Sequence, residues 1–172
     1  MKKNLLITLI AVAAICFGFQ AKAQTATSAP VTVNINLTDA ISITLGAAPT
    51  VNFDYTTAAD YAGPKTVEKA SHFTVVSNKP YDLTVAATGA FTPAGGPALN
   101  IVTVTVPAAT ANGGTPVANV PLSTTPAALV NNSTASTGAV YTVDYTISNP
   151  ASLLDLAGST YSTTVTYTAT QQ

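Results

Sequence analysis

Apolar and polar residues alternate along most of this chain, with the period of a β-strand. The stretch VTVNINL (31–37) places an apolar side chain at every second position and Thr or Asn between them. Because successive side chains of a strand point to opposite faces, this pattern predicts a strand with one apolar face. The same alternation recurs in ISITL, VNFDY, SHFTVVS, YDLTVAA, IVTVTV, YTVDYTIS and YSTTVTYTA, at 41–45, 51–55, 71–77, 81–87, 101–106, 141–148 and 161–169.

Turn-forming residues separate these strands. They predict a tight hairpin, a Gly/Pro-rich loop, a turn and a small polar loop, at 77–81, 88–100, 112–114 and 131–139. Two shorter proline-bounded segments, 117–122 and 127–130, are also predicted as strands. The predicted helix is limited to a turn or two within NPASLLDLAG (149–158), where Pro suits the first turn and Gly the end.

The strands are short and half apolar, and they follow one another closely. Most connections are too short to contain a crossover helix, which favours antiparallel pairing. The pattern therefore predicts an all-β fold, an antiparallel immunoglobulin-like β-sandwich of about seven to nine strands.

The first residues have the features of a secretory signal. Lys2 and Lys3 precede an apolar stretch at 5–19, and a small-x-small site follows at 21–23. The apolar stretch of about 15 residues is shorter than the roughly 20 that a membrane span needs. We therefore expect a signal peptide at 1–23, cleavage after Ala23, passage through the periplasm and a secreted or surface-bound domain at 24–172 without a membrane span.

Cysteine and charge are scarce in the expected domain. The one cysteine, Cys16, lies within the signal, so the domain has no disulfide. Three lysines stand against seven acidic residues, a net charge of −4, and the chain has no arginine. Binding to nucleic acid requires clustered Lys and Arg side chains, so nucleic acid is excluded as a partner.

Residues that carry reaction chemistry are equally sparse. His72 is the one histidine, and it is predicted to face solvent because its neighbour Phe73 is placed inward. A Ser–His–Asp arrangement would need a buried carboxylate to orient it. Transition metals favour clusters of His and Cys, and calcium favours several close oxygens, whereas the closest acidic pair is Asp54 and Asp60. We therefore expect a protein that is not an enzyme and has no cofactor or metal.

The tyrosines allow two interpretations. Tyr55 and Tyr61 flank a loop and are candidate ligand contacts, in which case the protein is a self-complete carbohydrate-binding module. Four others share their strand faces with Val or Ile, which favours core positions with hydroxyl groups at the edge of the core. These four are Tyr141, Tyr145, Tyr161 and Tyr167.

Two predicted strands, 31–37 and 161–169, carry neither charge nor proline. Edge strands of monomeric proteins are usually protected by Lys, Pro or bulges. Each of these strands is therefore either flanked on both sides within the fold or paired with another molecule. We expect the last strand to be an interior closing strand and 31–37 to be the strand shared between molecules.

This layout resembles the cysteine-free class of chaperone–usher pilin subunits. The likeness lies in VTVNINL (31–37) soon after the signal, TDAISITL (38–45) as a second strand, and the closing AGSTYSTTVTYTA (157–169). Small secreted sandwich modules of the WxL type end in a similar way. In the pilin family the N-terminal strand completes the groove of the next subunit. The residues that would insert are Val31, Val33, Ile35 and Leu37.

The resemblance implies a function through assembly. The protein would be a non-enzymatic structural or adhesive component of the bacterial cell surface. It would be a fimbrial subunit that assembles by strand donation, and its partners would be further copies or other surface subunits.

Overall fold

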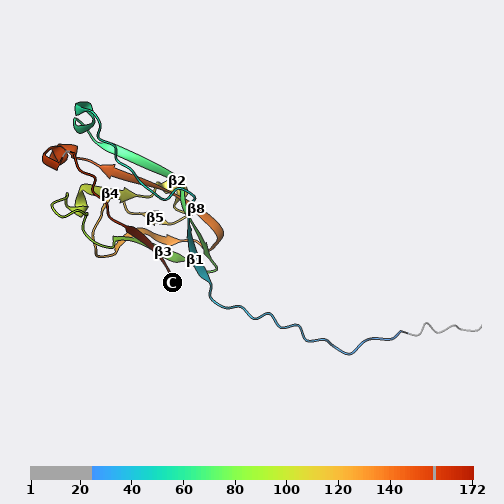
Figure 1. Cartoon of the computed structure of the whole chain (residues 1–172). Coiled ribbons are helices and arrows are strands. Elements are labelled where there is room, and N and C mark those ends of the chain that lie inside the picture. The colour runs from blue at the N-terminus through green and yellow to red at the C-terminus, as the bar shows by residue number, and fades with distance from the viewer. Residues whose placement is uncertain (1–24, 157) are drawn as a thin grey trace, which may run out of the picture. The chain divides into compact units, whose positions relative to one another are not determined.

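The computed structural model describes residues 25–156 and 158–172, and these form an antiparallel β-sandwich with nine strands (Figure 1). This confirms the fold class predicted from the sequence. The predicted signal at 1–23 lies outside the described residues. The chain divides into a short N-terminal unit, up to Asn36, and the sandwich unit Leu37–Gln172. The described part of the first unit, 25–36, contains no strand or helix.

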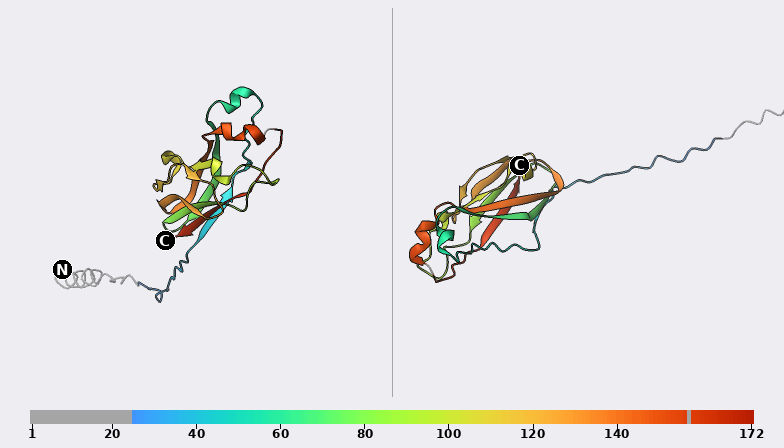
Figure 2. Two further views of the ribbon diagram at one scale, coloured as in Figure 1. Left: turned by 90° about the vertical axis from the view of Figure 1, so that its left-hand side faces the viewer. Right: turned by 90° about the horizontal axis from the view of Figure 1, so that it is seen from above.

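The sandwich unit consists of two sheets, seen as two layers of strands in Figure 2. One sheet has the order β1-β2-β8-β4-β6. Its strands are Ile41–Leu45, Lys65–Ser77, Ser136–Ile147, Val102–Thr105 and Val120–Pro121. The other has the order β5-β7-β3-β9. Its strands are Thr115–Pro116, Ala127–Ser133, Tyr81–Ala87 and Val165–Gln171.

Helix is limited to four short 3-10 segments in the described residues. They are η1 (Ala58–Tyr61), η2 (Leu99–Ile101), η3 (Ala108–Thr110) and η4 (Pro150–Leu156). The last agrees with the helical turns predicted within 149–158. None of the helices in these residues has the length and apolar character to cross a membrane.

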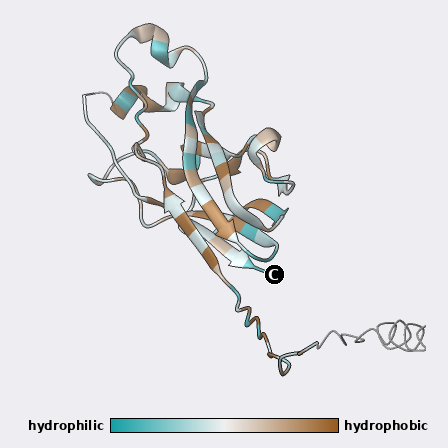
Figure 3. Cartoon of the chain, turned by 90° about the vertical axis from the view of Figure 1, so that its right-hand side faces the viewer, coloured by the Kyte–Doolittle hydropathy of each residue, from teal (hydrophilic) through white to brown (hydrophobic). Residues whose placement is uncertain are grey.

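The core lies between the sheets and is built from the apolar faces of the alternating strands, visible as alternating bands along the strands in Figure 3. Phe73 stacks on Tyr141, with ring centroids 5.0 Å apart, and packs against Tyr167, with ring centroids 4.7 Å apart. All three side chains are buried. The prediction of core positions for four tyrosines is therefore confirmed for Tyr141, Tyr145 and Tyr167, whereas Tyr161 lies before β9 and is only half-buried.

The buried tyrosine hydroxyl groups bond to one another. Tyr81 Oη lies 2.7 Å from Tyr141 Oη, and Tyr141 donates to Ser133 Oγ at 3.0 Å. A second pair joins Tyr145 to Tyr167. Burial raises the pKa of Tyr145 to about 12, so this phenol stays neutral and acts as a hydrogen-bonding group.

Two predicted connections differ from the structure. The segment 77–81 is a tight turn, but it links the two sheets, because β2 and β3 belong to different layers. The polar loop expected at 131–139 is wrong: β7 continues to Ser133 and β8 begins at Ser136. Small polar residues can occupy strand ends where their side chains find partners, as Ser133 does when it bonds to Ala111 O.

The solvent-facing position predicted for His72 is also wrong, because its side chain is 4% exposed. Ser71 has a φ of 51°, and the β2–β8 register shifts between Lys69 and Phe73. This bulge interrupts the alternation, so that His72 and Phe73 both turn inward. His72 Nε2 lies 2.8 Å from Tyr145 Oη.

We expect this histidine to make the sandwich sensitive to mild acid. Burial lowers the pKa of His72 below its usual 6.5, so the folded state favours the neutral ring. The unfolded chain then binds more protons below pH 6.5, and the free energy of unfolding falls as the pH drops from there to the folded pKa. The slope for one proton is at most about 1.4 kcal/mol per pH unit.

Urea denaturation at pH 7.5, 6 and 5 measures this effect. His72→Gln, which keeps a hydrogen-bonding group but does not titrate, is expected to lose the dependence in this range. Carboxyl groups with a lowered pKa, such as Asp82, titrate at lower pH in both proteins. Equal slopes in the two proteins would contradict the prediction.

Candidate functional site

Both sheets end on the same side of the sandwich. β1 is the last strand of one sheet and β9 the last strand of the other, and the two strands contact each other. Gln171, at the end of β9, donates from Nε2 to the carbonyl oxygen of Ala40, just before β1, at 2.9 Å. We call this side, formed by β1 and β9, the open side.

The expectation that the last strand is interior is wrong. β9 is an edge strand that pairs, within the described chain, with β3 alone. Its apolar residues face the core, while Thr166, Thr168 and Thr170 face solvent. Alternation reports one buried face of a strand, but it does not report how many neighbours the strand has.

The edges on the open side lack the usual protection. Each edge strand leaves a row of N–H and C=O groups unpaired, and natural edges are commonly protected by charge, proline or bulges. β1 (ISITL) and β9 (VTYTATQ) contain neither a charged residue nor proline. Both ladders are also regular, without a bulge. The open side therefore has the backbone chemistry needed to accept a further strand.

The apolar interior is incompletely covered on this side. The β1–β2 register places Ile43 and Leu45 opposite Val75 and Phe73, on the face of the sheet that holds the core. Yet Leu45 is 55% exposed, and Ile43 is half-buried. The inward residues Val165 and Ala169 of β9 are also only partly buried. An additional strand with an apolar face would cover these side chains.

The segment after β1 has the side-chain pattern of a strand without its hydrogen bonds. Val51, Phe53 and Tyr55 alternate and pack, half-buried, against the core, as the predicted strand 51–55 requires. However, no strand is assigned there. In the described part of the chain, no backbone N–H of 47–55 donates a hydrogen bond to another residue. The prediction is therefore right about the side chains and wrong about the pairing, because the segment belongs to no ladder in the described residues.

The candidate donor residues lie in a segment with no assigned strand. Val31, Val33, Ile35 and Leu37 are 83%, 80%, 79% and 86% exposed. Single exposed apolar residues are common, but four at alternate positions would form one apolar face when the segment is extended. The sequence left two alternatives for 31–37, a first strand of this sandwich or a strand given to another molecule. The structure assigns 31–37 to no sheet.

The candidate ligand contacts lie in a packed loop cluster. The rings of Tyr55 and Tyr61 are 4.9 Å apart and tilted by 40°, and Lys65 Nζ lies 5.0 Å from the centre of the Tyr55 ring. Lys65 also pairs with Asp60 at 2.9 Å. The two rings are thus inclined to each other, and the Lys65 ammonium lies over the Tyr55 ring.

Asp60, at the end of this loop, bonds to neighbouring residues of the same chain. The Lys65 ammonium and the N–H groups of Thr57 and Thr56 bond to Asp60 and hold its pKa well below the usual range. Both carboxylate oxygens are therefore engaged within the loop. Across residues 25–156 and 158–172, no three His, Cys, Asp or Glu side chains gather as the ligands of a metal ion would.

The open side thus combines two unprotected edges with partly exposed core residues. The chain also carries 31–37, whose alternation matches what the open side lacks. Residues that the sequence did not single out, above all Leu45 and Val165, complete this site. No protein-family model and no curated protein matches the chain.

Proposed function

We propose that this protein is a non-enzymatic structural subunit of a bacterial surface assembly, of the fimbrial kind. In this assembly, residues 31–37 of one copy pair with the open side of the next copy. The signal peptide predicted at 1–23 supports a site of action outside the cell. The observation that carries the proposal is the incomplete open side in a chain that also exposes an unpaired apolar segment, 31–37.

The lengths of the two partners agree. β9 contains seven residues, and the donor segment 31–37 has the same length. At about 3.3 Å per residue, such a strand spans about 23 Å, so one donor can pair along the whole of β9. Its Thr and Asn side chains would then face solvent together with the threonines of β9.

The energetic gain comes from apolar burial and from backbone pairing. Moving one exposed Val, Leu or Ile side chain out of water contributes about 1.5–3 kcal/mol. The donor offers four such side chains, and the open side offers its own half-exposed ones in return. Pairing also satisfies N–H and C=O groups along the free edge of β9, which no strand of the described residues reaches.

A mixing experiment tests the proposal. Ile35→Asp damages the donor and leaves the open side intact, while Leu45→Asp damages the open side and leaves the donor intact. Leu45 is 55% exposed, so the second variant is expected to fold. Each variant alone is expected to be monomeric, and an equal mixture is expected to form a dimer that grows no further.

Size-exclusion chromatography with light scattering reads the result. The dimer forms because the donor of the Leu45→Asp chain pairs with the open side of the Ile35→Asp chain. Growth stops there, because the donor of the Ile35→Asp chain and the open side of the Leu45→Asp chain are both damaged. A mixture that stays monomeric, or single variants that still assemble as the unchanged chain does, would contradict the proposed function.

A further inference from the structure

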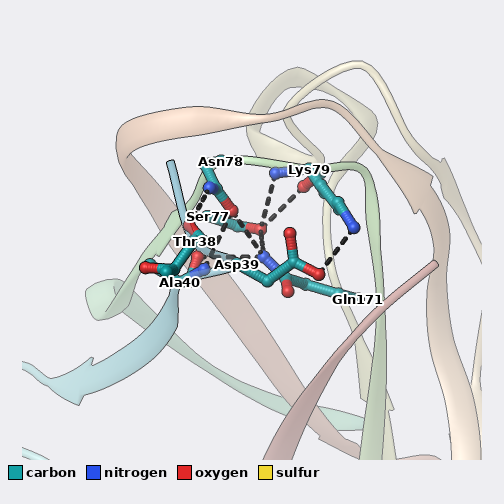
Figure 4. Close-up of polar contacts among 7 residues, drawn as sticks. All are labelled: Thr38, Asp39, Ala40, Ser77, Asn78, Lys79 and Gln171. Carbon is teal, nitrogen blue, oxygen red and sulfur yellow. Dashed lines mark hydrogen bonds and ion pairs between the residues drawn. The ribbon is translucent and has the colours of Figure 1, made fainter. Parts of the chain in front are cut away.

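The three residues between the donor segment and β1 are held by a cluster of polar contacts (Figure 4). Ala40 N donates to Asn78 Oδ1 at 3.0 Å, and Asn78 N donates to Ala40 O at 3.2 Å. Asn78 Nδ2 reaches further along the chain and donates to Thr38 O at 2.8 Å. One asparagine thus bonds to three backbone groups of the linker 38–40.

Two further residues help to hold the linker: Gln171 bonds to Asn78 and Ala40, and Lys79 pairs with Asp39. Gln171 Nε2 lies 2.9 Å from Asn78 Oδ1, 2.9 Å from Ala40 O and 3.0 Å from Ser77 Oγ. Lys79 Nζ pairs with Asp39 Oδ2 at 2.6 Å, although this pair is exposed and contributes little to stability. We call Asn78, Lys79 and Gln171 together the linker clamp.

The clamp continues the β1–β2 ladder beyond its last regular pair. That pair is Ile41 with Ser77, so the next pair in register is Ala40 with Asn78. The main chain turns away after Asn78 to begin β3 at Tyr81, and the side-chain carbonyl of Asn78 accepts the bond that a backbone carbonyl would accept in a ladder. Asn78 thus bonds to backbone groups of Thr38 and Ala40, two residues apart. In an extended strand, the backbone groups of residues two apart point to the same edge, so this spacing indicates an extended linker.

An extended linker has a consequence for the donor segment. To pair with β1 of its own chain, 31–37 would have to form a hairpin whose loop is the linker 38–40. Hairpin loops of two to five residues are common, so the length alone does not prevent this. Such a loop needs turn conformations, and the linker clamp holds the same backbone groups in the extended form.

We propose that the linker clamp prevents the donor segment from folding back onto its own chain and so reserves it for a second copy. The inference rests on the proposed function, because it concerns which open side the donor enters. Asn78 acts here as a positioning residue, since its bonds go to the linker and not to residues 31–37.

Hydrogen exchange of the monomeric chain tests the clamp. In Asn78→Ala, the amides of 31–37 are expected to exchange at least tenfold more slowly than in the unchanged protein, because the freed linker can turn and the donor can pair within the chain. Gln171→Ala should shift exchange in the same direction by a smaller factor. Gln172→Ala is the matched control, because Gln172 bonds to Asp82 and Asn132 instead.

The samples are kept at concentrations where size-exclusion chromatography shows a monomer. Circular dichroism confirms that each variant is folded. If Asn78→Ala unfolds, Gln171→Ala still provides the test, because Gln171 is a partly exposed residue at the end of β9. Equal exchange at 31–37 in the unchanged protein, Asn78→Ala and Gln171→Ala would overturn the clamp. Slow exchange at 31–37 in the unchanged monomer would overturn it as well.

A second readout separates this inference from the proposed function. At high concentration, strand donation predicts a ladder of SDS-resistant bands on an unboiled gel. This ladder is expected to shrink in Asn78→Ala and to stay unchanged in Gln172→Ala. If the unchanged protein formed no ladder, the proposed function would fail. The exchange of the monomers would then still decide whether the clamp controls the linker.

Discussion

Replacing Ile35 by aspartate is expected to abolish the SDS-resistant assembly of this protein and to leave the sandwich folded. Ile35 is 79% exposed and lies in the unit before the sandwich, so the substitution removes no core contact of the folded domain. In the assembled state the same side chain would be buried, and burying an unpaired carboxylate costs several kcal/mol. An unboiled SDS gel of the purified chain measures the assembly, and thermal unfolding measures the fold.

The control is Asn36→Asp, the same charge on the neighbouring position of the opposite strand face. This variant is expected to assemble nearly as well as the unchanged chain, because the polar face of the donor stays in solvent. Loss of the ladder in both variants would point to general charge repulsion. An intact ladder in Ile35→Asp would contradict strand donation through 31–37.

Phe73→Ala is expected to give the largest loss of stability among single substitutions in the core, about 3–5 kcal/mol. The Phe73 side chain is completely buried and packs against the rings of Tyr141 and Tyr167. Removing it leaves a cavity between the two sheets that these rings cannot fill. The loss is a large part of the roughly 5–15 kcal/mol that stabilises a typical domain, and urea denaturation measures it.

Val76→Ala is the matched control for this substitution. Val76 lies on the same strand, but it faces outward and is 41% exposed. Its truncation is expected to cost less than about 1 kcal/mol, because surface positions contribute little to packing. Similar losses in the two variants would mean that the core between the sheets is not arranged around Phe73.

The fold could be predicted from the sequence because the strongest signal in this chain, period-2 alternation, is also what builds a sandwich. The strands β3 and β8 are the best examples, since buried and outward positions alternate without a break along β3 and along 139–147 of β8. Alternation failed where the backbone departs from regular geometry. The bulge at Ser71 turned His72 inward, and no residue preference near it predicts this.

The candidate site was predictable in part, for a similar reason. The donor residues are consecutive in the sequence, so their alternation is visible without a structure. The open side is formed by β1 and β9, which only the fold brings together. The topology of the sheets decides whether a strand has one neighbour or two. The sequence of β9 shows an apolar face and the absence of charge, but not the number of neighbours. Asn78 carried no signal in the sequence, because its importance depends on where the β1–β2 ladder ends.

The most direct test of strand donation is an SDS gel of the purified chain from Gln24 onward, loaded both unboiled and boiled. A donated strand that pairs with the free edge of β9 and covers the exposed core residues should leave only when the sandwich unfolds. We therefore expect a ladder of bands in the unboiled lane and one monomer band after boiling. A single monomer band in both lanes, from protein concentrated enough to associate, would contradict the central claim that 31–37 is shared between copies.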